Sequence, residues 1–243
     1  MQVSRIALLL AIVLALMAQW PAQALALTGE ITHLSGALLA RRADGQTRIL
    51  SIKSAVEEGD ILATAENTYA RIRFADGTDI VMRPSSQLRI DAYKYEASAP
   101  ERDNVLFSLI KGGLRTVTGL LGRRNSAKYR LATPTATVGI RGTVFGTQYC
   151  NNDCAGIQTP SGRPLDNGLH VDVSDGTVIV TTNAGSLEFR VGEFGYVGGI
   201  DLLPVHIAPE QGFRVQAPGP VLGQVLAAGA GLGKANDLEC AVR

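Results

Sequence analysis

The chain has 243 residues, and its 23 basic and 22 acidic side chains leave a formal net charge of +1. A balance this close to neutral argues against a dedicated nucleic-acid-binding protein, which would need a strongly basic face. The length fits one large domain, or one domain with an extension, and allows a hydrophobic core that needs no metal or disulfide to fold.

The N-terminus has the three parts of a secretory signal peptide. Arg5 is the only charged residue before Glu30, residues 6–18 form an unbroken apolar run, and Ala24-Leu25-Ala26 is a small-x-small cleavage site. We therefore predict cleavage after Ala26 and a periplasmic or extracellular location. The alternative is a membrane anchor, but the run is shorter than the ~20 residues that span a bilayer core. We expect no stable membrane span after cleavage, and no lipid anchor, because no cysteine lies near the cleavage site.

Beyond residue 26 the sequence predicts strands throughout, because short apolar or alternating runs are separated by Gly, Asp, Asn and Pro. Asp44-Gly45, Asp76-Gly77 and Asp175-Gly176 each lie between two such runs, which predicts three hairpins. The alternation around the second pair favours a three-residue loop with Gly77 in the left-handed conformation. The alternation around the third pair fits a two-residue loop.

The middle of the chain predicts a strand, a kink at Gly112-Gly113 and a second strand. Pro134 marks a strand start or a bend, and Gly139 and Gly142 indicate a bulge or close backbone packing. We expect an all-β fold, either a jelly-roll-like β-sandwich or a short coiled β-stack built from hairpins. Residues 201–243 are broken by prolines and are expected to form a loosely ordered extension.

An ordered series of short segments in this β region resembles the FecR domain, a periplasmic module. The segments are Gly59-Asp60-Ile61-Leu62, Thr64, 70–78, 80–86, Leu88-Arg89-Ile90, 107–114 and 131–145. The resemblance covers roughly residues 59–150, with an extra hairpin to about Thr182. Transmembrane anti-sigma regulators share only this outer domain with the chain, which looks like the free type that carries a signal peptide.

The resemblance implies a ligand- or partner-binding role, sensory or regulatory, and no reaction. It also divides the chain into a signal peptide (1–26), an N-terminal β hairpin (27–58), a FecR-like β domain (59–182) and C-terminal strands with an extension (183–243). The partner would be an envelope protein or a glycan. The alternative is a structural or surface-assembly component that offers a strand edge to another envelope protein or a glycan.

The three cysteines are Cys150, Cys154 and Cys240. Export to an oxidising compartment makes a disulfide plausible, and we favour Cys150 with Cys154 because Asn-Asn-Asp between them is a turn sequence. Pairing with Cys240 stays open. The three histidines lack metal-ligand spacing and no G-x-S-x-G motif occurs, so we expect no metal, no cofactor and no enzyme activity.

A cationic segment is the remaining candidate site, since no Asp or Glu lies between Lys111 and Gln148. Arg123, Arg124, Lys128 and Arg130 are our candidates for binding an anionic partner, such as lipid A phosphates, an acidic glycan or an acidic protein. The alternative interpretation makes them ordinary outward positions whose acidic partners come from neighbouring strands.

Overall fold

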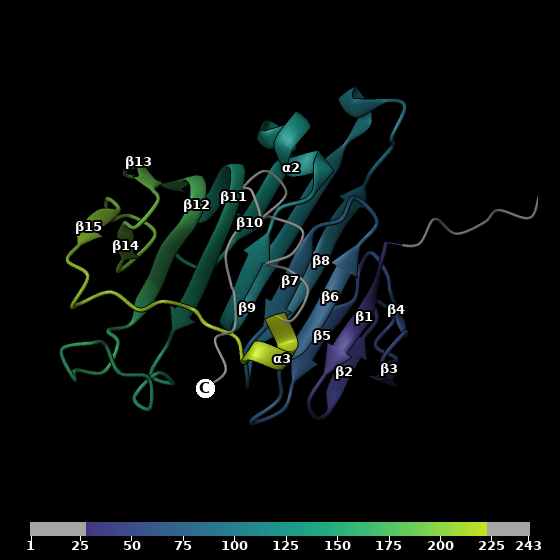
Figure 1. Cartoon of the computed structure of the whole chain (residues 1–243), viewed down its shortest axis with the longest axis horizontal. Coiled ribbons are helices and arrows are strands. Elements are labelled where there is room, and N and C mark those ends of the chain that lie inside the picture. Colours follow the sequence, from purple (N-terminus) through teal and green to yellow (C-terminus); the bar gives the residue numbers. More distant parts are fainter. Residues whose placement is uncertain (1–27, 223–243) are drawn as a thin grey trace, which may run out of the picture.

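A computed structural model describes residues 28–222 of the chain (Figure 1). All strands in that range belong to one hydrogen-bonded sheet, which folds over into two layers. This confirms the all-β prediction. Helix is confined to short segments: α2 (Leu120–Arg124), α3 (Gly219–Leu222) and the 3₁₀ turns Pro100–Arg102 and Ser126–Lys128. The predicted signal peptide, Cys240 and the rest of the predicted extension beyond residue 222 lie outside the described residues.

Each layer is a run of hydrogen-bonded neighbours. Layer A contains, in sheet order, β4 (Ala55–Val56), β1 (Gly29–Leu34), β6 (Ala70–Phe74), β7 (Asp79–Met82), β9 (Asn104–Val117), β11 (Thr137–Cys150), β12 (Gly168–Thr182), β14 (Phe194–Val197) and β15 (Val205–Ile207). Layer B contains β3 (Thr47–Leu50), β2 (Leu38–Arg41), β5 (Ile61–Thr64), β8 (Gln87–Lys94), β9, β10 (Tyr129–Ala132), β11, β12 and β13 (Gly185–Arg190). The pairing of β10 with β9 is parallel, and the other pairings are antiparallel.

Three long strands, β9, β11 and β12, belong to both layers and turn the corner between them. Each corner has a glycine with positive φ: Gly112 at 76°, Gly142 at 56° and Gly176 at 73°. The kink predicted in β9 and the irregularity predicted near Gly142 are therefore confirmed, and the register of β11 shifts between Arg141 and Val144.

The third predicted hairpin is wrong. Asp175-Gly176 lies inside the continuous strand β12, whose two halves pair with the two halves of β11. Gly176 packs against the Gly142 corner, where a Cβ on Gly176 would lie 2.3 Å from the carbonyl oxygen of Gly142. The positive φ that marks a hairpin loop in a short ribbon here bends one strand between two layers.

The first two predicted hairpins are present. Leu38 pairs with Leu50 across the Asp44-Gly45 turn. At the second turn, the amide of Phe74 donates to the carbonyl of Thr78, and Gly77 has a φ of 83°, which gives the expected three-residue loop. The strands of residues 27–58 do not stand apart, because β1 pairs with β6 and β2 pairs with β5.

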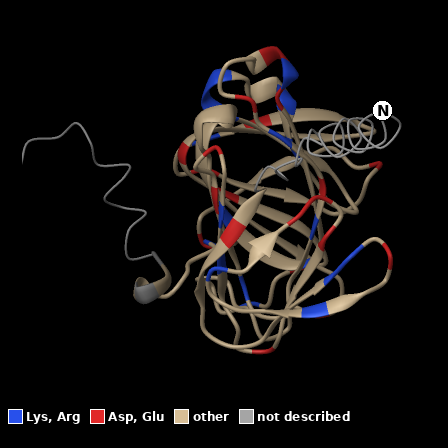
Figure 2. Cartoon of the chain, turned by 90° about the vertical axis from the view of Figure 1, so that its right-hand side faces the viewer, with Lys and Arg blue, Asp and Glu red and all other residues tan. Residues whose placement is uncertain are grey.

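The hydrophobic core fills the space between the layers. Inward-facing residues alternate along each strand, as a half-buried sheet requires. Fully buried examples are Ile31, Ile72, Ile80, Leu114 and Phe145 from layer A and Leu38, Leu62, Leu88, Phe107, Leu131 and Val180 from layer B. Figure 2 looks from the β1 end and shows the layers around this interior, with charged residues concentrated in the loops near α2.

The outer face of layer A is covered by a C-terminal strap, residues 208–222, which crosses the sheet from β15 towards β7 (Figure 1). The amide of Val215 donates to buried Asp172 at 2.9 Å, and Arg115 donates to the carbonyl of Val215 at 3.4 Å. Farther along, Ala217 packs on Val81. The described part of the predicted loose extension is therefore packed, because β12 and β9 supply polar partners for its backbone.

Candidate functional site

A long loop, residues 151–167, joins β11 to β12 and carries the candidate site. It begins at a disulfide between Cys150 and Cys154, which the structure forms with an S–S distance of 2.09 Å. Both cysteines are buried and pack against Leu165. Connections longer than about 12 residues without their own secondary structure are uncommon and are often binding loops.

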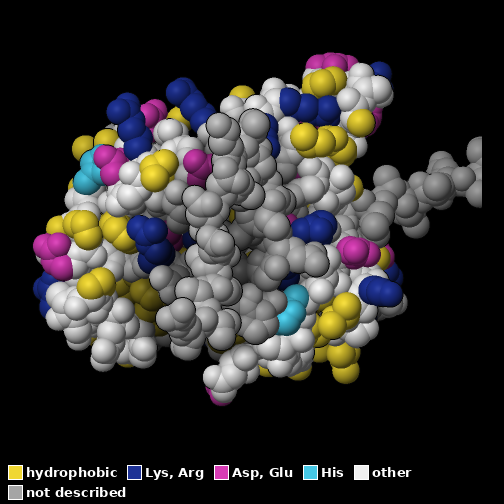
Figure 3. Space-filling model, in the orientation of Figure 1, with side chains coloured by type: hydrophobic (Ala, Val, Ile, Leu, Met, Phe, Trp, Pro, Cys, Tyr) yellow, Lys and Arg dark blue, Asp and Glu magenta, His cyan; other side chains and the backbone are white. Residues whose placement is uncertain are grey.

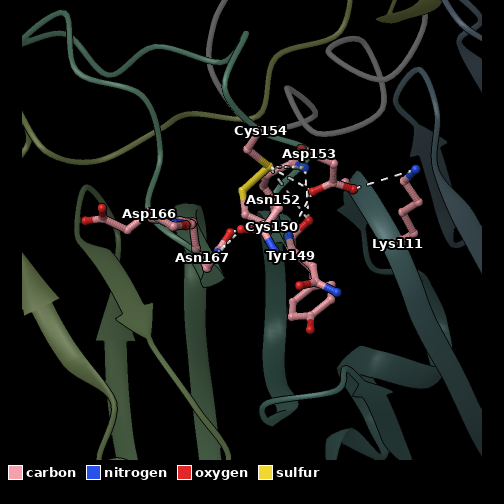
Figure 4. The surroundings of a disulfide bond; sticks show 12 residues. Lys111, Tyr149, Cys150, Asn152, Asp153, Cys154, Asp166 and Asn167 are labelled. Atoms are coloured by element: carbon pink, nitrogen blue, oxygen red, sulfur yellow. Dashed lines mark hydrogen bonds and ion pairs between the residues drawn. A yellow bond between two sulfur atoms is a disulfide. The ribbon is translucent and has the colours of Figure 1, made fainter.

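The disulfide turn is tied to the end of the same loop (Figure 4). The amide of Asn152 donates to the side-chain oxygen of Asn167 at 2.7 Å, and the Asn167 amide group donates to the Asn152 side chain at 2.8 Å. Asp153 forms an ion pair with Lys111 of β9 at 3.8 Å. These contacts hold the loop as a closed structure against layer A.

A pocket of about 280 Å³ opens between this loop, β12, β14 and the start of the strap. Its polar walls come from Thr159, Arg163, Asp166, His170, Tyr196 and Gln211, and its apolar walls from Leu165 and Ile207. A concave site with a few converging polar groups is the usual form of a small-molecule binding site.

His170 is the buried polar residue of this pocket, with 5% of its surface exposed. Its Nε2 lies 2.9 Å from the carbonyl oxygen of Asp166. Because a carbonyl oxygen only accepts, Nε2 carries the proton of the neutral ring and Nδ1 presents its lone pair. Burial lowers the pKa of His170, although the Asp166 carbonyl opposes part of that shift. Among the described residues Nδ1 has no hydrogen-bond partner.

Tyr196 forms the aromatic wall. Its ring centroid is 5.0 Å from that of His170, and its hydroxyl donates to the carbonyl of Asn167 at 2.6 Å. Partial burial, followed by the nearby Asp166 carboxylate, raises the pKa of the Tyr196 hydroxyl. The ring is therefore held in place by the loop that it faces, with the phenol protonated at neutral pH.

The predicted cationic residues lie near the opposite end of the strands, around α2 (Figure 1). Arg124 is committed to the fold: it makes two hydrogen bonds to the fully buried carboxylate of Asp103 at 2.9 and 2.8 Å, and two to backbone carbonyls. Its guanidinium also lies 4.7 Å from the ring centre of Tyr95. Arg124 therefore anchors the loop before β9.

Arg123, Lys128 and Arg130 are exposed on α2, the following 3₁₀ turn and β10. Within residues 28–222 none of the three forms an ion pair. Other cations of the segment do find acids on neighbouring elements, as in Lys111 with Asp153 and Arg141 with Glu188. The structure thus separates the four predicted residues into one anchor and three exposed cations.

Sequence reasoning missed the pocket. His170 was considered only as a metal ligand, and Asp166, Arg163 and Tyr196 carried no recognisable motif. The available signal was the length of the loop between β11 and β12, because long loops held by a rigid scaffold are where binding residues concentrate.

Two further classes of site are not found in the described part of the chain. No three His, Cys, Asp or Glu side chains gather there as a metal ion would need. Of the helices between residues 28 and 222, none has the length and apolar character needed to cross a membrane.

Comparison with solved structures gives distant similarity. Two crystal structures of a provisionally assigned anti-sigma factor from Parabacteroides distasonis ATCC 8503 are 14% and 15% identical, with TM-scores of 0.45 and 0.46. Each match covers 62% of this chain, which spans 60% of each of those chains. A cell surface anchoring domain is 31% identical over 26% of this chain and 82% of that chain, with a TM-score of 0.25. No curated protein has a matching sequence.

A family model described as FecR protein matches residues 60–188, which is more than half of the chain. The match starts beside β5, ends within β13 and includes all three corner-turning strands. It extends the resemblance that the sequence indicated, which ran only to about Thr182. The chain therefore belongs to the FecR protein family.

Proposed function

We propose that this protein is an exported, non-catalytic binding module of the bacterial envelope, with a sensory or regulatory role, and that the pocket beside His170 is its ligand-binding site. The observation that carries the proposal is a pocket with an unpartnered buried acceptor in a FecR-family chain. The apparent signal peptide at residues 1–26 supports export. The membership supports an envelope role, since the FecR domain is a module of the envelope.

The absence of a reaction is part of the proposal. The described residues around the pocket offer no nucleophile paired with a general base, because His170 binds a backbone carbonyl through Nε2. A fixed neutral imidazole, an aromatic ring and two charged side chains are suited to recognition.

The proposal is tested by photo-crosslinking in living cells. A photoreactive residue at Gln211, in the pocket wall, should form adducts with an envelope component, and the same residue at Arg130, near the opposite end of the strands, serves as the matched control. Adducts at Gln211 and none at Arg130 support a pocket-based role. Adducts at Arg130 alone, or at neither position, would contradict it.

A second candidate function is a structural or surface-assembly component. Within the described residues β3 pairs only with β2, and β13 pairs only with β12, so each layer-B end has an unpaired strand edge. Ile49 on β3 is 80% exposed. Hydrophobic side chains also gather at the β13–β15 end (Figure 3), among them Ile200, Leu202, Leu203 and Val205. Open, apolar edges are where a partner strand adds to a sheet.

This second function predicts assemblies that depend on the edge. The Ile49→Lys variant should dissociate a stable envelope complex measured by size-exclusion chromatography of solubilised envelopes. An unchanged complex in that variant would remove β3 as the assembly edge.

The three exposed cations Arg123, Lys128 and Arg130 remain our candidates for contact with an anionic envelope partner. They would act as a charged rim, and not through a pocket. Binding through them should weaken steeply with salt, because exposed charges are screened within about 8 Å at physiological ionic strength.

A further inference from the structure

The wall of the pocket contains an acceptor without a donor. Nδ1 of His170 is buried and unpartnered among the described residues, whereas Nε2 is occupied by the carbonyl of Asp166. Buried polar atoms in folded proteins almost always have a hydrogen-bond partner. The lone pair therefore calls for a donor that a ligand brings, and a hydroxyl group is such a donor.

The charges of the pocket cancel. Arg163 and Asp166 both line it, and neither forms an ion pair within residues 28–222. Burial lowers the pKa of His170, which keeps the third titratable group of the wall uncharged at neutral pH. A ligand with a large net charge would meet an opposing charge as well as a matching one. A neutral ligand whose groups both donate and accept satisfies all of them.

The shape of the wall favours a ring with an apolar face. Tyr196 presents its aromatic ring, held by the hydrogen bond from its hydroxyl to Asn167, and Leu165 and Ile207 supply aliphatic surface. Gln211 adds one donor and one acceptor group. The volume of about 280 Å³ lies just under the range of ~300–1,000 Å³ typical of drug-sized ligands, so the occupant is small.

We propose that the pocket binds a neutral sugar ring of an envelope glycan, with one hydroxyl donating to Nδ1 of His170 and another to the carboxylate of Asp166, and with an apolar face of the ring packed on Tyr196. This inference rests on the proposed binding function and names its ligand class. A sugar fits because each hydroxyl both donates and accepts, which matches a wall that mixes Asp166 with Arg163. The C–H face of the ring supplies the apolar surface that Tyr196 requires.

The test uses the full chain purified from the envelope fraction. Titration calorimetry with methyl glucoside, methyl galactoside and N-acetylglucosamine should show millimolar binding of at least one of them. Glucuronate and alanine are the charged and zwitterionic comparison probes. Binding of either in preference to all three neutral sugars would overturn the ligand class, and so would the absence of sugar binding by the wild-type protein.

Two variants test the geometry independently. Tyr196→Leu removes the aromatic face, and His170→Gln keeps a donor for the Asp166 carbonyl but removes the Nδ1 acceptor. Each should weaken the best sugar about tenfold, roughly the effect of one lost contact of this kind. Arg130→Ala is the control and should bind like the wild type, and thermal melts establish that each variant is folded. Equal sugar binding in both folded pocket variants and the wild type would place the sugar elsewhere.

The two proposals fail in distinguishable ways. Adducts at Gln211 without sugar binding would retain the pocket as a binding site and reject the ligand class. No adducts at Gln211 and no sugar binding would reject both.

Discussion

The corner between the layers gives a sharp quantitative prediction, because two glycines with positive φ face each other there. Gly142 and Gly176 have φ values of 56° and 73°. A Cβ on Gly142 would meet its nearest neighbour, the Arg123 side chain, at 3.7 Å, which is an ordinary contact. A Cβ on Gly176 would lie 2.3 Å from the carbonyl oxygen of Gly142 and 2.9 Å from that of Arg141.

The Gly142→Ala variant should therefore carry only the left-handed backbone penalty, about 1–2 kcal/mol. The Gly176→Ala variant adds the cost of displacing packed backbone, typically about 1–3 kcal/mol, so its total should be about 3 kcal/mol or more. For a domain of this size each kcal/mol lowers the Tm by about 2–4 °C. The two substitutions are chemically identical, so their difference isolates the close approach of β12 to β11.

Urea unfolding of both variants and the wild type, followed by circular dichroism, measures these free energies. The account expects similar m-values, since the surface exposed on unfolding should hardly change. Equal destabilisation of the two variants would refute the reasoning, because an Asp175-Gly176 hairpin loop open to solvent would tolerate alanine like Gly142.

Three more predictions concern the strap, the disulfide and the α2 anchor. Burial raises the pKa of Asp172, opposed by the Val215 amide and by Arg115, so its stabilising contribution is full below the unfolded pKa of about 3.9 and is lost as pH rises through the folded value; unfolding free energies of wild type and Asp172→Asn, measured from pH 4 upward, should converge or cross, and parallel curves would contradict this. Cys154→Ser should cost about 2 kcal/mol by the loop-closure model, seen as a lower Tm that reductant no longer changes; an unchanged Tm would show that the closed turn adds nothing. Arg124→Ala should expose the loop before β9 to protease and Arg123→Ala should not, since only Arg124 neutralises buried Asp103; equal cleavage would argue against the anchor.

The fold was predictable where local signals and global structure agree. Alternating residues placed Ile72 and Ile80 on the core face, and Gly77 gave the loop type of the second hairpin. The third Asp-Gly pair misled because its local chemistry is the same in a hairpin loop and at a strand corner. Only the pairing of β12 with β11 along its whole length, a non-local fact, distinguishes the two.

The pocket was less predictable than the fold. Tyr196 and His170 come from different strands, and Gln211 comes from the start of the strap, so no sequence spacing links them. The cationic segment had the opposite problem. It was visible in the sequence, but the sequence could not show that Arg124 is taken up by Asp103, which lies on another loop.

The claim on which the account depends most is that this binding module works outside the cytoplasm. Intact-mass analysis of the protein from separated cell fractions tests it directly. The account predicts a periplasmic or extracellular chain that begins at Leu27. A chain that keeps Met1 and stays in the cytosolic fraction would contradict it, and the envelope ligand assigned to the pocket would then have no access to the protein.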